Sequence, residues 1–431
     1  MKERGGHESV RLRASGLASA TAFAIALAFA APAGAVESAI ILSPAPSVGA
    51  EMAYAVDVGA TTLTLGAPGE NDIAGAAYVV DCATLPCGVP LRIAPAQLAA
   101  GDAFGTALSI SGGTLAVTAP GATPGAAYVF VGDGVGWSQQ AKLEPTGLAS
   151  GERFGQAVSL SGDRVAVGAG RIGGSSTGAV YVFVRNGTAW TQEAKLTPAD
   201  GHAFDAFGAS VSLDADTLVV GAPMKASGAP GSYANGAAYV FTRDGAGWTE
   251  QVELTVAGTN GDLFGYAVDV AADRAVIGAP YALTAQGQAY VFAGSGAAWS
   301  QQAVLTSAVG AAGDQLGWSV ALGDASVFVG APFAGQANGT ACGASYVFDA
   351  ASLGETAGTT IEAPVANELA GWSVAASGVR WATSAPGREV GAFDHAGAAY
   401  WFDPTITIFH AGFDAPGACA GIGDVSPRTA R

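Results

Sequence analysis

The sequence predicts an all-β fold in which seven copies of one four-stranded antiparallel sheet stand side by side. Three features carry this prediction, and each recurs at steps of 50 to 58 residues. Every copy opens on a two-residue anchor that is Phe-Gly in its clearest form. Its second segment ends in a triplet such as Gly-Ala-Pro, and its third segment is centred on a Tyr. Seven such sheets are expected to close into a seven-bladed β-propeller, because radial repetition leaves only short, protected edges.

The clearest copy lies near the middle of the chain and holds four short apolar segments. The first, Phe207–Leu213, alternates apolar and polar residues with the period of two that is typical of a strand. The second, Thr217–Pro223, is apolar on both parities, which indicates a strand covered on both faces. A tight turn separates these two. A loop rich in Gly and Pro then precedes Ala237–Phe241, and Gly247–Leu254 completes the sheet.

The other six copies repeat the same residue types at corresponding places. Their anchors are Met52-Ala53, Phe104-Gly105, Phe154-Gly155, Phe264-Gly265, Leu316-Gly317 and Ala370-Gly371. The third segments of the seven copies carry Tyr78, Tyr128, Tyr181, Tyr239, Tyr290, Tyr346 and Tyr400. The fourth segments of copies two to five carry Trp137, Trp190, Trp248 and Trp299. These large side chains are expected to fill the widening space between neighbouring sheets, so we assign them to the core.

The FG…GAP…YVF pattern resembles the FG-GAP repeat of integrin α-subunit propellers and of many secreted bacterial proteins. The resemblance covers roughly residues 37–403 and implies a propeller that serves as a binding or adhesion scaffold. In the calcium-binding blades of that family, a D-x-D/N-x-D-G-x-x-D loop joins strands one and two. The corresponding turns in this chain hold at most two carboxylates, whereas calcium takes about six to eight oxygen ligands. We therefore expect no metal and no cofactor.

Three regions are expected along the chain, a signal peptide at 1–35, the propeller at 36–403 and a tail at 404–431. The first region has basic residues, then the short apolar run Leu17–Ala30 and the small-residue motif Ala33-Gly34-Ala35. This order is typical of a secretory leader that is cut after Ala35. A membrane anchor is the alternative, but the apolar run is short for a bilayer span. The expected location is therefore outside the cell, in the periplasm or in the cell envelope.

Charge narrows the range of partners. Residues 1–35 hold four basic and two acidic residues, so the net charge falls from −17 to −19 when they are removed. A surface this acidic repels nucleic acids and anionic membranes. The expected partner is an extracellular or envelope protein or a glycan, and we expect no nucleic acid and no membrane span after the leader is cut.

Two segments compete for the outer strand of the last blade. Ala39–Pro44 resembles the ends of the fourth strands, yet it precedes the first anchor. We expect it to pair with the last blade, because joining the two chain ends closes the ring and removes a free edge. Ile406–Phe409 could take the same place.

The four cysteines predict disulfides in an oxidising compartment. Cys82 and Cys87 are close in sequence and are expected to form a local disulfide across a turn. Cys342 could pair with Cys419 in the tail, although the sequence does not fix this pairing. The spacing is not that of a zinc site.

Loops on one face of the ring are the expected ligand-binding surface. In an antiparallel meander, the loops between strands two and three (2–3 loops) share a side with those that lead from strand four to the next strand one (4–1 loops). We call this side the loop face. Its 2–3 loops are long and variable, and loops of this kind on a rigid scaffold commonly bind partners. Tyr233, Phe333, Phe393 and His395 are the aromatic residues expected to be exposed there. The alternative is that they pack within their own loops.

An acidic residue stands two positions before six of the anchors. This series comprises Asp102, Glu152, Asp205, Asp262, Asp314 and Glu368. We place it near the mouth of the central channel, where a carboxylate ring would attract a cation or a basic ligand. The alternative is that each carboxylate accepts backbone N–H groups in its own loop. His202 stands close to Asp205, so these two residues join the candidate binding set.

The leading functional prediction is a non-catalytic scaffold that recognises a protein or a glycan through the loop face. The alternative is a hydrolase-like enzyme with a site at the channel mouth that uses His202 and neighbouring carboxylates. No G-x-S-x-G elbow and no paired Cys/His arrangement accompanies His202 in the sequence, so no catalytic residue is assigned. A third possibility is a purely structural envelope protein. Convergence of His202 with several carboxylates would favour the enzyme.

Overall fold

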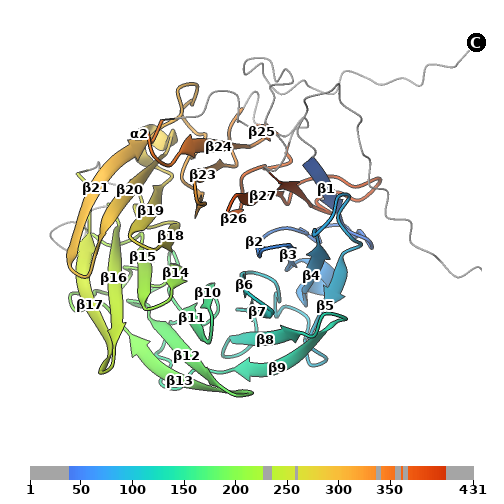
Figure 1. Ribbon diagram of the computed structural model, residues 1–431, viewed down its shortest axis with the longest axis horizontal. Coiled ribbons are helices and arrows are strands. Elements are labelled where there is room, and N and C mark those ends of the chain that lie inside the picture. The colour runs from blue at the N-terminus through green and yellow to red at the C-terminus, as the bar shows by residue number, and fades with distance from the viewer. Residues whose placement is uncertain are drawn as a thin grey trace, which may run out of the picture.

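The computed structural model describes residues 38–226, 235–257, 261–335, 341–354, 361–362 and 367–403. Seven four-stranded antiparallel sheets stand around a central axis (Figure 1). In each sheet the first strand of the repeat is innermost. The predicted seven-bladed β-propeller is therefore confirmed, and we number its blades one to seven in the order of their anchors.

Each blade holds four strands, ordered from the innermost to the outermost. Blade 1 holds β2 (Val56–Val58), β3 (Thr62–Ala67), β4 (Ala76–Asp81) and β5 (Leu91–Ile93), and blade 2 holds β6 (Leu108–Ser111), β7 (Thr114–Ala119), β8 (Ala126–Gly132) and β9 (Trp137–Leu143). Blade 3 holds β10 (Ala157–Ser161), β11 (Arg164–Gly168), β12 (Val180–Asn186) and β13 (Ala189–Leu196), and blade 4 holds β14 (Ser210–Asp214), β15 (Thr217–Ala222), β16 (Ala237–Asp244) and β17 (Gly247–Leu254). Blade 5 holds β18 (Val268–Ala271), β19 (Arg274–Ala279), β20 (Gln288–Ser295) and β21 (Ala298–Leu305), and blade 6 holds β22 (Ser319–Leu322), β23 (Ser326–Ala331), β24 (Ala344–Asp349) and β25 (Ile361–Glu362). Blade 7 holds β26 (Val374–Ser377), β27 (Arg380–Ala385), β28 (Ala398–Phe402) and β1 (Ser38–Leu42).

The N-terminal strand closes the ring. Strand β1 pairs antiparallel with β28, with Ser38 opposite Phe402 and Leu42 opposite Ala398. The outer strand of blade 7 therefore comes from the other end of the chain, as the Ala39–Pro44 segment predicted (Figure 1). The competing segment Ile406–Phe409 lies outside the described residues.

The apolar core lies between the blades. Phe207 is fully buried and meets Val182 and Leu196 of blade 3 together with Tyr239 and Phe241 of its own blade. The Phe207 ring makes edge contacts with those of Tyr239 and Phe241, at centroid distances of 5.5 and 5.9 Å. The same contacts recur around Phe104, Phe154 and Phe264. The anchor Phe and the repeat Tyr are thus core residues, as predicted.

The anchor glycine joins neighbouring blades as well as neighbouring strands. Gly208 has a φ of +86°, and its N–H donates to the Gly221 carbonyl within blade 4 at 2.9 Å. A Cβ added to Gly168 of blade 3 would collide with the Gly208 carbonyl oxygen. Phe207 also forms a parallel bridge with Gly178 of blade 3. The anchor glycine therefore permits close backbone approach both within a blade and between that blade and its neighbour.

Side chains of the innermost strands in blades 1 to 5 form hydrogen bonds to the next blade. One strand position is polar in blades 1 to 5, where it is occupied by Asp57, Ser109, Ser159, Ser212 and Asp269. Each side chain accepts a backbone N–H from the innermost strand of the following blade, at 2.7 to 3.1 Å. Blades 6 and 7 carry Ala321 and Ala375 there, and Ala cannot form this bond. This side-chain hydrogen bond is therefore absent on both sides of blade 7, the blade that β1 completes.

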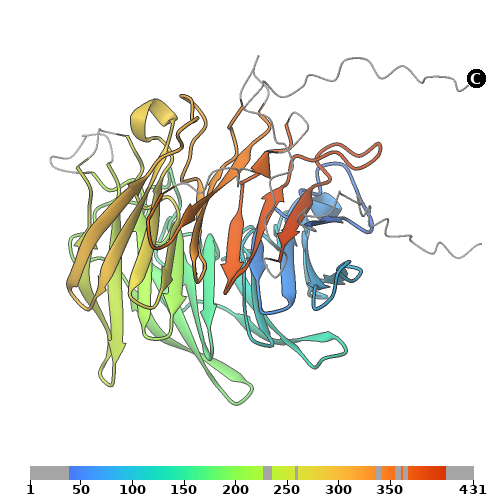
Figure 2. The same cartoon turned by 45° about the horizontal axis from the view of Figure 1, so that its top comes forward.

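The 2–3 loop of each blade runs beside the 4–1 loop of the next, so these loops share one face as expected. The Ala103 N–H donates to the Ile73 carbonyl at 2.7 Å, and the Phe204 N–H donates to the Ser176 carbonyl at 3.0 Å. Two 2–3 loops contain single helical turns, α1 (Glu70–Ile73) and α2 (Ala282–Ala285). Figure 2 shows α2 (gold) at one edge of the ring and the long 3–4 hairpins at the opposite edge. Neither turn is long enough to cross a membrane, and the described residues contain no other helix.

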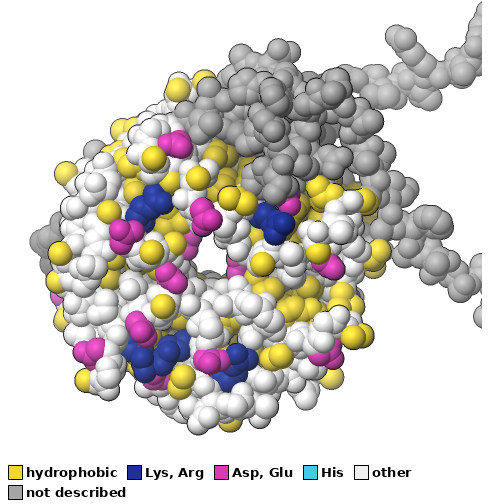
Figure 3. Space-filling model, viewed as in Figure 1, with side chains coloured by type: hydrophobic (Ala, Val, Ile, Leu, Met, Phe, Trp, Pro, Cys, Tyr) yellow, Lys and Arg dark blue, Asp and Glu magenta, His cyan; other side chains and the backbone are white. Residues whose placement is uncertain are grey.

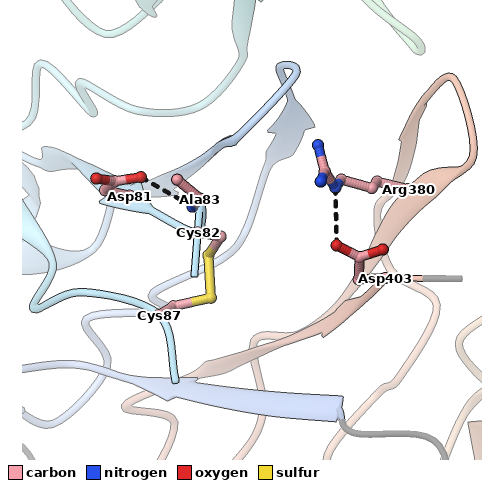
Figure 4. The surroundings of a disulfide bond; sticks show 6 residues. All are labelled: Asp81, Cys82, Ala83, Cys87, Arg380 and Asp403. Atoms are coloured by element: carbon pink, nitrogen blue, oxygen red, sulfur yellow. Dashed lines mark hydrogen bonds and ion pairs between the residues drawn. A yellow bond between two sulfur atoms is a disulfide. The ribbon is translucent and has the colours of Figure 1, made fainter. Parts of the chain in front are cut away.

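The predicted local disulfide is present. Cys82 and Cys87 are bonded in the loop that follows β4, where Asp81 also accepts the Ala83 N–H (Figure 4). The nearby ion pair between Arg380 and Asp403 ties the ends of β27 and β28 together. Cys342 is also disulfide-bonded. Its predicted partner, Cys419, lies outside the described residues.

Candidate functional site

Four aromatic side chains meet on the loop face, where the chain enters the innermost strands. Tyr54, Tyr266, Trp318 and Trp372 each follow directly after an anchor, in blades 1, 5, 6 and 7. These four blades are consecutive because the ring closes between blades 7 and 1, where the Val56 N–H donates to the Ser373 hydroxyl. All four aromatic residues are half-buried, so each keeps part of its surface exposed. We call this set the aromatic arc.

Successive rings of the aromatic arc are in contact. The centroid distances are 4.7 Å from Tyr266 to Trp318, 4.9 Å from Trp318 to Trp372 and 5.5 Å from Trp372 to Tyr54. The planes of successive rings are inclined by 45°, 48° and 53°. Neighbouring blades of a seven-fold ring are rotated by about 51°, so the aromatic rings follow the rotation of the blades. They form a curved wall at the mouth of the central opening on the loop face. Figure 3 shows the central opening from the opposite face, on the side of the 3–4 hairpins.

Two further aromatic residues extend the arc outward on blades 5 and 6. The Phe333 ring lies 5.4 Å from that of Trp318, so this predicted site residue contacts the arc. Tyr281 is exposed and lies close to Tyr266. Burial raises the pKa of the Tyr266 hydroxyl, and the hydroxyls of Tyr281 and Tyr54 raise that pKa further. The Tyr266 and Tyr54 hydroxyls are therefore neutral at pH 7 and can donate hydrogen bonds.

The aromatic residues are confined to one side of the mouth. Blades 2, 3 and 4 carry Thr106, Gln156 and Ala209 at the position that the arc occupies in the other blades. Those three blades have the same four strands, so an aromatic residue at this position is not needed to build a blade. Partly exposed aromatic clusters that the fold does not require are typical of binding surfaces.

Comparison with known proteins agrees with the repeat pattern. The model of the FG-GAP repeat family matches residues 92–130, 137–183, 190–241, 248–292 and 299–348, which is more than half of the 431 residues. The chain belongs to the FG-GAP repeat family. The matched ranges include Tyr266 and Trp318, while Tyr54 and Trp372 follow the two weakest anchors and lie outside them.

No curated protein matches the chain. Among solved structures, the crystal structure of the Saccharomyces cerevisiae Sqt1 has 10% sequence identity with a TM-score of 0.46. That similarity covers 79% of this chain and 82% of the Sqt1 chain.

A charged group borders the blade 1 end of the arc. The Glu51 N–H donates to the His395 carbonyl at 2.9 Å, and His395 Nδ1 lies 2.7 Å from Asp394 Oδ1. Burial raises the pKa of the Glu51 carboxyl, and His395 partly offsets that rise. The Glu51 carboxyl in turn raises the pKa of Tyr54, after the larger effect of burial. The predicted site residue His395 therefore lies beside the arc.

The remaining predicted aromatic residues are separate from the arc. Phe393 is exposed, and its backbone forms an isolated antiparallel β-bridge with that of Val390. No contact of its ring with another described aromatic ring is present. Tyr233 lies outside the described residues.

Most carboxylates of the acidic series cap their own 4–1 loops. Four of them accept the backbone N–H of the residue three positions earlier, at 2.7 to 2.8 Å: Asp102 from Ala99, Glu152 from Ala149, Asp205 from His202 and Asp314 from Ala311. Glu152 and Glu368 also accept the hydroxyls of Tyr181 and Tyr400, at 2.7 and 3.0 Å. Both tyrosines are in third strands, two strands away from the channel. The placement of Glu152 and Glu368 near the channel mouth is therefore wrong, because these side chains turn outward to satisfy a buried Tyr hydroxyl.

His202 does not gather carboxylates around its ring. The residue is exposed, and only its backbone N–H donates to Asp205, which is itself buried. The described residues contain no group of three or more His, Cys, Asp or Glu that could hold a metal ion. The convergence that would favour an enzyme is thus not observed among these residues.

Sequence reasoning missed the four residues of the aromatic arc. Their common signal is the residue that directly follows each anchor. This position is aromatic in four copies and holds Thr106, Gln156 or Ala209 in the other three. The four residues form one continuous row only because the ring closure places blades 7 and 1 side by side.

Proposed function

We propose that this protein is an exported, non-catalytic binding scaffold whose loop face recognises an extracellular or envelope protein or a glycan. The aromatic arc is the observation that supports this proposal. It offers a continuous row of half-buried Tyr and Trp rings on the face formed by the 2–3 and 4–1 loops. Tyr and Trp dominate binding energetics because they bury large areas while keeping a polar group for orientation. The rigid propeller holds these rings in place before a ligand arrives, which lowers the entropic cost of binding.

Binding measurements with matched Trp variants test this proposal. The exported chain is screened against a glycan array and a panel of purified extracellular proteins. The double variant Trp318→Ala/Trp372→Ala is compared with Trp137→Ala, which removes a half-buried Trp from the hairpin edge on the opposite side. We expect the arc variant to lose at least about tenfold in affinity for any retained ligand and the control to bind normally. Equal binding by the arc variant and the wild type would contradict the proposal.

A further inference from the structure

We propose that the aromatic arc binds the end of a neutral oligosaccharide, with a pyranose ring lying against Trp318 and Trp372. This inference rests on the proposed function and specifies its ligand. A pyranose has an apolar face of C–H groups and an edge of hydroxyls, so its binding site needs an aromatic surface next to neutral hydrogen-bonding groups. The mouth of the central opening combines both.

The two sides of the mouth differ in composition. One side is the arc, with ring centroids 4.7 to 5.5 Å apart. The other side carries Thr106, Gln156 and Ala209 at the same repeat position, which supply a hydroxyl, an amide and a small side chain. Thr106 Oγ1 donates to the Ala103 carbonyl at 2.7 Å, and this leaves its lone pairs available to accept hydrogen bonds. A sugar can stack on the first side and form hydrogen bonds to the second.

The indole N–H groups of the arc differ from those of the fourth strands. In the fourth strands, Trp190, Trp248 and Trp299 donate their indole N–H to Gln140, Glu193 and Gly296, at 2.8 to 3.0 Å. The indole N–H groups of Trp318 and Trp372 have no such acceptor among the described residues. The indole nitrogen of Trp401 is buried without a hydrogen-bond partner, whereas those of Trp318 and Trp372 are not among the buried atoms that lack one. The two arc indoles therefore remain available to donate to a ligand.

The charge of the mouth also favours a neutral ligand. None of the seven residues that directly follow the anchors is charged. The acidic chain also repels polyanions such as sulfated glycans. A cationic ligand would need carboxylates at this position. The Glu51 carboxyl lies beside Tyr54, at one end of the arc only. A neutral ligand fits this composition best.

Titrations monitored by Trp fluorescence and calorimetry test the ligand class. The exported chain is titrated with neutral hexose and N-acetylhexosamine oligomers, with a sulfated oligosaccharide and with a lysine-rich peptide. We expect saturable binding of at least one neutral oligomer only. Trp318→Ala and Trp372→Ala should each weaken it about tenfold or more, while Trp318→Phe retains part of the affinity. Glu51→Gln and Trp299→Ala should bind as the wild type does. The Ala variants are expected to fold because blade 4 carries Ala209 at the same position.

The outcomes separate this inference from the proposed function. If the peptide or a purified protein binds and Trp318→Ala abolishes that binding, the site stands and the saccharide inference is wrong. A loss of affinity in Glu51→Gln would likewise indicate a cationic ligand and overturn the inference alone. If a neutral oligosaccharide binds to Trp318→Ala and Trp372→Ala as well as it binds to the wild type, both the binding role of the arc and the saccharide inference are wrong. The same holds if none of the probes, glycans or proteins binds at all.

Discussion

The indole rings of Trp318 and Trp372 lie 4.9 Å apart with their planes inclined by 48°. This angle is close to the rotation of about 51° between neighbouring blades of a seven-fold ring. The two residues occupy the same position in successive copies of the repeat. Aromatic residues at one position of consecutive repeats therefore form a continuous surface, because the propeller places equivalent positions side by side.

Trp318 and Trp372 are expected to stabilise each other only modestly. Aromatic pairs contribute about 0.5–1.5 kcal/mol beyond the burial of their area, so the coupling free energy in a double-mutant cycle should lie in that range. Chemical denaturation of the wild type, Trp318→Ala, Trp372→Ala and the double variant measures it. A coupling well above this range would mean that the arc is mainly structural.

Phe207→Ala should destabilise the fold strongly. The side chain is fully buried between blades 3 and 4, and removal of a buried Phe costs about 3–5 kcal/mol. Phe207→Leu should cost clearly less, because blade 6 carries Leu316 at the same place. Phe204→Ala, at an exposed loop position, is the control and should change the free energy of unfolding by about 0.5 kcal/mol or less. Equal effects of Phe207→Ala and Phe204→Ala would contradict the assignment of the anchor to the core.

The Asp57 carboxyl should make stability decline as pH rises. The pKa of this carboxyl is raised to about 6, mainly by burial and to a smaller extent by Asp269. Hydrogen bonds from the N–H groups of Ile110 and Val58 and from the Ser109 hydroxyl partly offset the rise. In the unfolded chain the value is 3.8. The stabilising contribution is therefore complete below the unfolded value and is lost as pH rises through about 6. A shift of this size corresponds to about 3 kcal/mol. The free energy of unfolding is measured for the wild type and for Asp57→Asn from pH 3.5 to 7.5. The wild type should lose stability relative to Asp57→Asn as the pH rises. A difference that does not change with pH would contradict this prediction.

The Glu193 carboxyl should have the opposite pH dependence. Burial alone would raise its pKa, but hydrogen bonds from Trp248, Arg164 and Arg243 outweigh burial and hold the pKa below its usual value. The contribution of Glu193 is thus present above the unfolded value of 4.5 and is lost as pH falls through the lower folded value. Glu193→Gln should cost about 1.5–3 kcal/mol at pH 7, since the charged acceptor of hydrogen bonds within blade 3 and between blades 3 and 4 is lost. Urea denaturation at pH 7 and pH 3 tests this, and an equal cost at both values would exclude the charged network.

Calcium should leave the melting temperature unchanged. The turns between strands one and two hold at most two carboxylates each, and no metal-binding group is found among the described residues. A ligand that binds only the folded state raises the melting temperature, so thermal melts with millimolar calcium and with EDTA are decisive. A rise of several degrees would show that carboxylates assigned to loop capping bind metal.

The ring and its closure follow from the sequence because the repeat determines both. Phe207 and Tyr239 recur at a near-constant step, and their burial requires a neighbouring blade. Ala39–Pro44 lacks a blade of its own, so it completes blade 7. The acidic series shows where such reasoning fails. Glu152 turns outward because the buried hydroxyl of Tyr181 needs an acceptor, and no local pattern reveals that partner.

The proposed binding surface is harder to predict from the sequence than the fold. Attention to long loops selected Phe333 and His395, which do lie beside the arc, and also Phe393, which does not contact it. Tyr54 and Trp372 are 318 residues apart in sequence and become neighbours only when the ring closes. Long-range contacts of this kind depend on tertiary structure and are absent from local hydrophobic patterns.

Fluorine NMR of the exported chain labelled with 5-fluorotryptophan tests the central claim most directly. The resonances are assigned by single Trp→Phe substitutions, and the neutral oligosaccharide that a glycan array retains best is then titrated. We predict that the Trp318 and Trp372 resonances shift with saturation, whereas those of Trp137, Trp190, Trp248 and Trp299 do not. Unchanged Trp318 and Trp372 resonances at saturating ligand would contradict the assignment of binding to the aromatic arc.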